Sequence, residues 1–264
     1  MVEKQRLDIA LVERELAPTR EKARGMIMAG EVTVNGQMVD KPGTRIAVSD
    51  DVQIKPRQRF VSRGGDKLAG ALVDFGFDVV ERVCADVGAS TGGFTDCLLT
   101  NGAKRVYAID VGYGILDYRL RQDERVVVME RTNARYVQTL PEAVSLVVVD
   151  ASFISLKLLL PVFQAWMQTP ADVIALIKPQ FEAGQKDVGK GGVVKDSAVH
   201  ERVLTEVVEN ALQQGYSLLG MTVSPLKGPA GNTEFFGWFG WKTDTPAIAD
   251  AAAAIQQTVQ RSTN

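Results

Sequence analysis

Two charged residues stand directly after apolar runs of the chain and could together move a proton. Asp150 follows the run 146–149, and Lys178 follows the run 173–177. If both runs are strands of a parallel sheet, the two side chains lie at its carboxyl edge, where open sheets bind their ligands. Partial desolvation favours the neutral form of a lysine and a nearby carboxylate orients it, so Lys178 could accept a proton from a hydroxyl group. On their own, the two residues are better explained as an ordinary ion pair at the sheet edge.

A glycine-rich stretch, residues 86–95, reads D-V-G-A-S-T-G-G-F-T and separates an apolar run from a helix-like segment. It predicts a strand, a tight turn and a helix start, and its glycines let the backbone pass close to a ligand. The spacing G-x-x-x-G-G differs from the dinucleotide fingerprint G-x-G-x-x-G, and no Gly-Lys-Ser/Thr ending of a phosphate-binding loop follows. A ligand without a pyrophosphate is favoured, and S-adenosylmethionine fits, while a purely structural turn is the alternative. The cofactor-binding candidates in this stretch are Asp86, Gly88, Ser90, Thr91, Gly92, Gly93, Phe94 and Thr95.

Further cofactor candidates follow the next predicted strands. Asp110 lies about twenty residues beyond the glycine turn, where an acidic side chain can accept hydrogen bonds from both ribose hydroxyls of an adenosine. A helix cap explains a single aspartate at a strand end equally well. Gly112 gives the backbone room beside the cofactor, and Asn133 and Ala134 are expected to contact the adenine edge. Asp150, which ends a strand at the same edge, completes the expected cofactor contacts.

The elements that must position these residues alternate between apolar runs and helical patterns from residue 82 onward. Such alternation is typical of a parallel sheet with helices on both faces. The predicted strands are 83–87, 105–109, 126–130, 145–149, 173–177, 218–223 and 234–241. Seven strands, the last aromatic-rich and hairpin-like, predict an α/β, Rossmann-like, class I S-adenosylmethionine-dependent methyltransferase fold with a mostly parallel sheet. The segment 243–264 is expected to contain a helix of unassigned role.

The first part of the chain predicts a separate, small α+β domain. Residues 6–16 and 20–29 have helical apolar spacing, and the second segment has Thr19 as its N-cap and Gly30 at its end. Asn35-Gly36 between short strands is a strong hairpin signal, and further strands are expected at 45–48 and 52–54. The motifs R-L-D, T-R-E-K-A-R and G-E-V-T-V-N-G resemble the small RNA-binding module named after ribosomal protein S-four. The predicted domains are 1–58, which includes a linker, and 59–264.

The resemblance to this module implies that basic side chains contact folded RNA, which proteins recognise largely through backbone charge and shape. The glycine- and lysine-rich segment 183–192 is predicted to be a loop that adds contacts beside the active site. The RNA-binding candidates are Arg6, Arg20, Lys22, Arg24, Arg57, Arg59, Arg63, Lys186 and Lys190. A solvated surface is the alternative for each of them taken singly.

Motifs spread through the second predicted domain carry a wider resemblance. They are S-R-G-G-D-K-L around Lys67, the glycine stretch, V-D-A-S-F-I-S-L at Asp150, L-I-K-P-Q-F-E at Lys178 and G-N-T-E-F-F at Glu234. With them, residues 6–242 resemble the TlyA-like enzymes, also called the haemolysin A family, whose catalytic domain is of the FtsJ type. The resemblance implies methyl transfer from S-adenosylmethionine to a ribose 2'-hydroxyl of structured RNA, namely cytidine in ribosomal RNA.

The same resemblance implies a catalytic tetrad made of Lys67, Asp150, Lys178 and Glu234. In that scheme Lys178 is the base, Asp150 and Glu234 orient it, and Lys67 positions the ribose. No metal is expected, because the leaving group, S-adenosylhomocysteine, is neutral.

The composition disfavours several other classes of protein. Among the 264 residues, of which 45% are apolar, no apolar run approaches the ~18 residues of a membrane span. The charged N-terminus leads into no secretory signal, so a cytoplasmic protein with no membrane partner is expected. Two cysteines and one histidine do not suit a zinc site or a cysteine nucleophile.

Ribosomal RNA or ribosomal subunits are the expected partners, and the sequence leaves the oligomeric state open. A non-catalytic RNA-binding or ribosome assembly factor is the first alternative. A membrane-active haemolysin and a base methyltransferase agree less well with the sequence.

Overall fold

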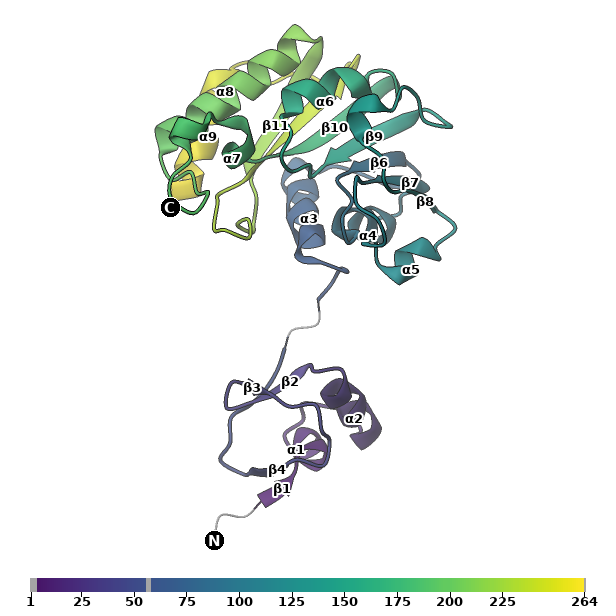
Figure 1. Ribbon diagram of the computed structural model, residues 1–264, viewed down its shortest axis with the longest axis vertical. Coiled ribbons are helices and arrows are strands. Elements are labelled where there is room, and N and C mark those ends of the chain that lie inside the picture. Colours follow the sequence, from purple (N-terminus) through teal and green to yellow (C-terminus); the bar gives the residue numbers. More distant parts are fainter. Residues whose placement is uncertain (1–3, 56–57, 264) are drawn as a thin grey trace. The chain divides into compact units, whose positions relative to one another are not determined.

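The computed structural model describes residues 4–55 and 58–263. By its internal contacts the chain divides into two compact units, Met1–Gln58 and Arg59–Asn264 (Figure 1). Each unit has its own apolar core.

The first unit is built from two short helices and two small sheets. Its elements are β1 (Lys4–Arg6), α1 (Leu7–Glu13), α2 (Arg20–Met28), β2 (Val32–Val34), β3 (Gln37–Met38), β4 (Arg45–Ala47) and β5 (Val52–Ile54). One sheet has the order β3-β2-β5 and is antiparallel, and β1 pairs with β4. Strand β1 was not predicted, because the polar sequence K-Q-R has no alternation of apolar residues.

The predicted turn chemistry of this unit is confirmed. Thr19 Oγ1 accepts a hydrogen bond from the Lys22 backbone N–H at 3.2 Å and caps α2. Asn35 and Gly36 both have positive φ, at 51° and 78°, as the two central residues of a tight hairpin turn require.

The second unit has a seven-stranded sheet with helices on both faces. Its elements are α3 (Arg63–Phe75), β6 (Val83–Val87), α4 (Gly93–Thr100), β7 (Arg105–Ile109), α5 (Tyr118–Arg121), β8 (Val126–Met129), η1 (Ala134–Tyr136), β9 (Val144–Val149), α6 (Leu156–Phe163), β10 (Met167–Ile177), α7 (Pro179–Glu182), η2 (Gln185–Asp187), α8 (Ser197–Gln213), β11 (Tyr216–Val223), β12 (Phe235–Trp241) and α9 (Ala251–Thr263). The strand order is β11-β12-β10-β9-β6-β7-β8. Strand β12 is antiparallel to both its neighbours, and the pairs among β10, β9, β6, β7 and β8 are parallel. The predicted α/β class with a mostly parallel sheet is confirmed.

The strand order creates a switch point at the centre of the sheet. From β6 the chain moves outward through β7 and β8, and it then returns to place β9 on the other side of β6. At such a point the loops after two adjacent strands leave in opposite directions and open a crevice at the carboxyl ends. The loops after β6 and β9 meet there.

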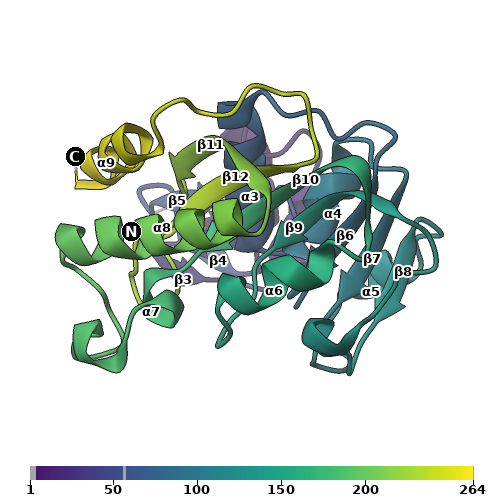
Figure 2. The ribbon, with the colours of Figure 1, turned by 90° about the horizontal axis from the view of Figure 1, so that it is seen from above.

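Alternate residues of the central strands supply two separate apolar layers. Val147 and Val149 of β9 pack with α6, α8 and α9 on one face, whereas Leu146 and Val148 pack with α3 and α4 on the other. Helices α6 and α8 lie along the same face in Figure 2. The C-terminal helix α9, whose role the sequence left unassigned, buries Ile255 in the first of these layers.

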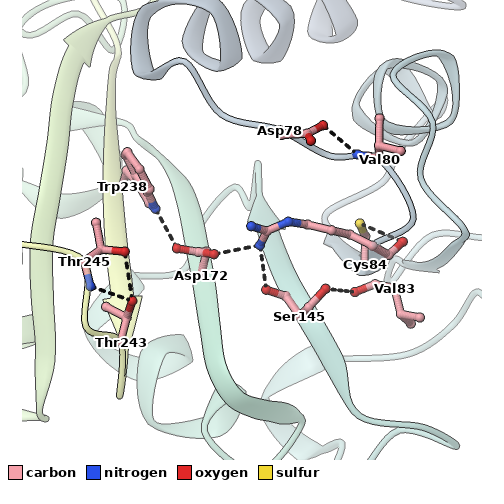
Figure 3. A network of polar contacts seen from close by, with 10 residues as sticks. Asp78, Val80, Val83, Cys84, Ser145, Asp172, Trp238, Thr243 and Thr245 are labelled. Atoms are coloured by element: carbon pink, nitrogen blue, oxygen red, sulfur yellow. Dashed lines mark hydrogen bonds and ion pairs between the residues drawn. The ribbon is translucent and has the colours of Figure 1, made fainter.

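A polar network ties the amino ends of the central strands together. Asp172 of β10 accepts hydrogen bonds from Arg82 at 2.7 Å and from the Trp238 indole at 2.8 Å. Arg82 also donates to the Ser145 carbonyl at 3.3 Å, and Figure 3 shows Ser145 and Trp238 on either side of Asp172.

Strand β10 begins at Met167, six residues before the predicted start at residue 173. The exposed 168–170 segment has no apolar side chain pattern, so the sequence does not reveal this start.

Candidate active site

Strands β9 and β10 bring Asp150 and Lys178 together at the carboxyl edge. The strands are parallel neighbours, with Val149 opposite Ala175, so the residues that follow them emerge side by side. Lys178 Nζ lies 2.6 Å from Asp150 Oδ1. Nζ also donates hydrogen bonds to the Asp150 carbonyl oxygen at 3.3 Å and to Ser152 Oγ at 3.0 Å, so Lys178 contacts both the side chain and the backbone of the 150–152 segment.

A second buried ion pair lies at the same end of the unit. Lys67, in the first turns of α3, places Nζ 2.5 Å from Oε2 of Glu234, which directly precedes β12. Only 7% of Lys67 and 1% of Glu234 is exposed. Gly228 packs so closely that a Cβ there would lie 2.5 Å from Glu234 Oε1. The two side chains can be buried because their opposite charges are paired. Either charge buried alone would be strongly destabilising.

Gln180 connects the two ion pairs. Its Nε2 donates to Glu234 Oε1 at 3.3 Å, and it lies two residues after Lys178. The structure thus brings all four predicted tetrad residues into one constellation. The predicted orientation of Lys178 by Glu234 is not seen, because the lysine that Glu234 contacts in the described residues is Lys67. Gln180 was missed, although it stands within the motif K-P-Q-F-E.

A cavity of about 310 Å³ opens beside Asp150. The predicted cofactor residues that line it are Gly88, Ser90, Asp110, Asn133, Ala134 and Asp150. Gly88 has a φ of +85°, and a Cβ there would lie 2.7 Å from the Asp150 carbonyl oxygen, so the β6 and β9 loops approach as closely as they do only with glycine.

Asp110 supplies carboxylate oxygens to this cavity. Its Oδ2 accepts from the Ser90 backbone N–H at 2.8 Å, and its Oδ1 accepts from the Gly112 N–H at 2.7 Å. Each carboxylate oxygen has two acceptor positions, so one remains on each for a pair of ligand hydroxyls. Asn133 uses its side-chain oxygen to cap η1 through the Arg135 N–H.

The rest of the glycine stretch has packing contacts instead. A Cβ on Gly93 would lie 2.7 Å from the backbone nitrogen of Gly65 in α3, one on Gly92 would meet Leu120, and Phe94 stacks on Phe236. The predicted cofactor residues that do not line the cavity are Asp86, Thr91, Gly92, Gly93, Phe94, Thr95 and Gly112. Their contact with a cofactor stays a prediction.

Asp86 lies beneath the turn as a fully buried carboxyl group. Its Oδ2 accepts from Thr95 Oγ1 at 2.6 Å, while Oδ1 has no hydrogen-bond partner among the described residues. Burial raises the pKa of Asp86 to about 7, and the nearby Asp150 adds to the rise against the hydrogen bond from Thr95.

In the first unit, two of the predicted RNA-binding arginines share one buried carboxylate. Arg6 and Arg20 each place Nε 2.9 Å from an oxygen of Asp8. The side-chain hydrogen bond from Arg6 leads the causes that lower the pKa of Asp8 to about 2. Lys22 and Arg24 are exposed on α2.

In the second unit, Arg59, Arg63, Lys186 and Lys190 are exposed, and Arg63 donates to the Lys227 carbonyl at 3.1 Å. Arg57 lies outside the described residues.

Comparison with known proteins identifies both parts of the chain. The model of the FtsJ-like methyltransferase matches residues 60–241, and that of the S4 domain matches residues 5–52. The chain belongs to the FtsJ-like methyltransferase family. The residues matched include all four members of the constellation and the whole cavity.

Relatives match over almost the whole length of this methyltransferase. The "16S/23S rRNA (cytidine-2'-O)-methyltransferase TlyA" of Mycobacterium tuberculosis is 45% identical over 269 residues, covering 99% of this chain and 98% of its own. "Hemolysin A" of Brachyspira hyodysenteriae is 40% identical and covers 89% of this chain and 99% of its own. A solved structure, "Putative hemolysin from Streptococcus thermophilus", is 42% identical, covers 100% and 97% of the two chains and has a TM-score of 0.76. In the described ranges, every helix is too short or too polar to cross a membrane.

Proposed function

We propose that this protein transfers a methyl group from S-adenosylmethionine to a ribose 2'-hydroxyl of structured RNA, and that the nucleotide is a cytidine of ribosomal RNA. The observation that carries the proposal is the pair of ion pairs, Asp150–Lys178 and Lys67–Glu234, beside a cavity at the switch point. A methyl transfer to a hydroxyl needs a group that accepts the hydroxyl proton next to a bound methyl donor. The two ion pairs and the cavity lie at one edge of the sheet, which supports this proposal.

The cavity residues suit an adenosine-containing cofactor. Asp110 would accept hydrogen bonds from the ribose hydroxyls, and Asn133 and Ala134 would contact the adenine. S-adenosylmethionine, when bound, supplies a methyl group on a sulfonium, which is electrophilic without help from a metal. The closeness of Gly88 to Asp150 would hold the methionine end of the cofactor near the charged constellation.

Lys178 is the proton acceptor in this proposal. In its neutral form Nζ takes the proton of the 2'-hydroxyl while the oxygen bonds to the methyl carbon and the carbon–sulfur bond breaks. Asp150, 2.6 Å away, stabilises the ammonium that results. Lys67, held by Glu234, would donate to the ribose oxygens and fix their direction. Lys178 returns its proton to water before the next turnover.

The first unit supports RNA as the substrate. An S4 domain matches it, and its exposed Lys22 and Arg24 on α2 offer positive charge that the Asp8 carboxylate does not neutralise. Residues 1–58 would recognise folded RNA, while 59–264 would carry out the chemistry. The cytidine is proposed on the names of the TlyA relatives.

The test is to incubate the full chain with methyl-labelled S-adenosylmethionine and, separately, small subunits, large subunits and naked ribosomal RNA. Digestion to nucleosides and mapping should place the label on ribose 2'-oxygens of cytidine. Lys178→Ala should abolish labelling while RNA binding is retained, which separates a catalyst from a binding-only assembly factor. Label on a base, or labelling that survives Lys178→Ala, would overturn the proposal.

A further inference from the structure

Two segments carry the Asp150–Lys178 pair, and they are joined to each other at several points. One is the 150–156 segment between β9 and α6, and the other is the 178–182 segment, which contains α7. The first contact is the hydrogen bond from Lys178 Nζ to Ser152 Oγ at 3.0 Å. The second is an aromatic contact between Phe153 and Phe181, whose ring centroids are 4.8 Å apart.

Glu182 makes the third and most extensive connection. Its Oε2 accepts from Ser155 Oγ at 2.6 Å, and its Oε1 accepts from the Leu156 backbone N–H at 2.7 Å. Ser155 is itself the N-cap of α6 and accepts from the Lys157 N–H at 3.2 Å. One carboxylate at the end of α7 therefore fixes the first turn of α6.

The surroundings of Glu182 disfavour its ionised form, so the carboxylate is retained at a cost in free energy. Burial raises the pKa of Glu182 in spite of the two hydrogen bonds it accepts, and Lys157 nearby offsets only part of that effect. A neutral cap at the start of α6 is already present in Ser155, so capping alone does not require Glu182.

The 150–156 segment is also one that needs to be held. Phe153 has a φ of 62°, in the left-handed region that bulky side chains rarely adopt, and 89% of it is exposed. Residues 151–154 line the cofactor cavity next to Asp150. Movement of this segment would shift the Asp150 carboxylate and the cavity wall together.

We propose that Glu182 is a positioning residue, which fixes the 150–156 segment against the 178–182 segment and so sets both the Asp150–Lys178 contact and the wall of the cofactor cavity. The inference rests on the proposed function for the catalytic part and on the cavity for the binding part. Loss of the hydrogen bonds to Glu182 leaves every reacting group present but loosely placed, and a misplacement of ~1 Å can cost about 100-fold in rate.

The test compares three variants of the full chain with the wild type. Glu182→Ala removes both hydrogen bonds, whereas Glu182→Gln keeps an oxygen for the Leu156 N–H and an amide for Ser155 Oγ. Asp250→Ala is the matched control, since Asp250 also caps a helix in this unit, accepting from Ala253 N at 2.9 Å at the start of α9. The measurements are the melting temperature, the affinity for S-adenosylmethionine by titration, and kcat and KM for methylation of ribosomal RNA.

Glu182→Ala should weaken S-adenosylmethionine binding about 10-fold and lower kcat at saturating substrates about 10- to 100-fold, with the KM for RNA within about 2-fold. Glu182→Gln should restore the cofactor affinity and kcat to within about 3-fold of wild type. Asp250→Ala should lower the melting temperature and leave the cofactor affinity and kcat unchanged. If Glu182→Ala matches Asp250→Ala in cofactor affinity and kcat, the positioning role is overturned. If the wild type binds the cofactor but methylates no RNA, the proposed function fails, and the cofactor affinities still decide whether Glu182 positions the cavity wall.

Discussion

A lysine that acts as a base must lose its proton, whereas a lysine in a structural ion pair must keep it. The contacts of Lys178 with Asp150 and Ser152 would be made by either kind of residue. What distinguishes the two roles is whether the charge can be removed. Arginine retains its proton at all accessible pH values, so it can replace an ion-pair lysine but not a base.

Lys178→Arg should therefore retain binding of RNA and S-adenosylmethionine within a few-fold and lose at least about 100-fold in kcat. The positive charge beside Asp150 persists, but the variant has no neutral amine to accept the proton of the 2'-hydroxyl. Single-turnover methylation with pre-bound RNA measures this directly. Activity of Lys178→Arg near the wild-type level would assign Lys178 to the ion pair alone.

The buried Asp86 predicts a pH dependence of stability. Its pKa is about 7 in the folded chain and has an ordinary value of 3.8, so the folded state holds a proton that the unfolded state releases between these pH values. The free energy of unfolding contributed by Asp86 is thus greatest below about pH 4 and falls as pH rises toward 7.

Asp86→Asn removes this titration while keeping an oxygen for Thr95. We expect the stability of Asp86→Asn relative to wild type to increase from pH 5 to pH 8, measured by denaturant unfolding without cofactor. Because the two proteins share all their other titratable groups, the contributions of those groups cancel in the difference between the two free energies of unfolding. A difference that stays constant, or that decreases over this range, would contradict the assignment.

At the level of elements, the contact between α3 and α4 positions Lys67. Gly93 at the start of α4 lies against α3, where an added Cβ would be 2.7 Å from the Gly65 backbone nitrogen. Backbone cannot rotate aside as a side chain can, so the two helices must separate. Helix α3 carries Lys67 to Glu234, and its displacement would disturb that buried pair.

Gly93→Ala should lower the free energy of unfolding by about 1–3 kcal/mol and reduce methylation as well. Gly64→Ala is the matched control, because its Cβ would meet its nearest neighbour at an ordinary 3.5 Å. We expect Gly64→Ala to be neutral or slightly stabilising by denaturant unfolding. Equal effects of the two substitutions would show that the helix contact is not tight.

The sequence predicts features that depend on neighbouring residues better than contacts between residues that are far apart in the chain. Asp150 and Lys178 were placed correctly because each directly follows an apolar strand, and a parallel sheet brings such ends together. The Lys67–Glu234 pairing joins residues 167 positions apart and depends on where α3 packs, which no local pattern encodes. Glu182 was missed for the same reason, since its partners belong to the loop after another strand.

On the scale of the whole molecule, the two units predict a division between RNA capture and chemistry. In the first unit, Asp8 binds Arg6 and Arg20 and neutralises part of their charge, so the exposed Lys22 and Arg24 should contribute most of the electrostatic attraction of α2 for RNA. Each phosphate contact that is lost removes counterion release and lowers the dependence of binding on salt.

Replacing both Lys22 and Arg24 with Ala should weaken ribosomal RNA binding and reduce the slope of log K against log salt by about 1.5–2. Binding of S-adenosylmethionine should not change, because the cavity proposed for it is lined by the second unit, and kcat at saturating RNA should stay within about 2-fold. Glu21→Ala, which removes an exposed acidic side chain from the same helix, serves as the control and should leave RNA affinity equal or higher. An unchanged salt slope in the double variant would mean that Lys22 and Arg24 of α2 do not contact phosphates, and RNA capture would then have to come from other parts of the chain.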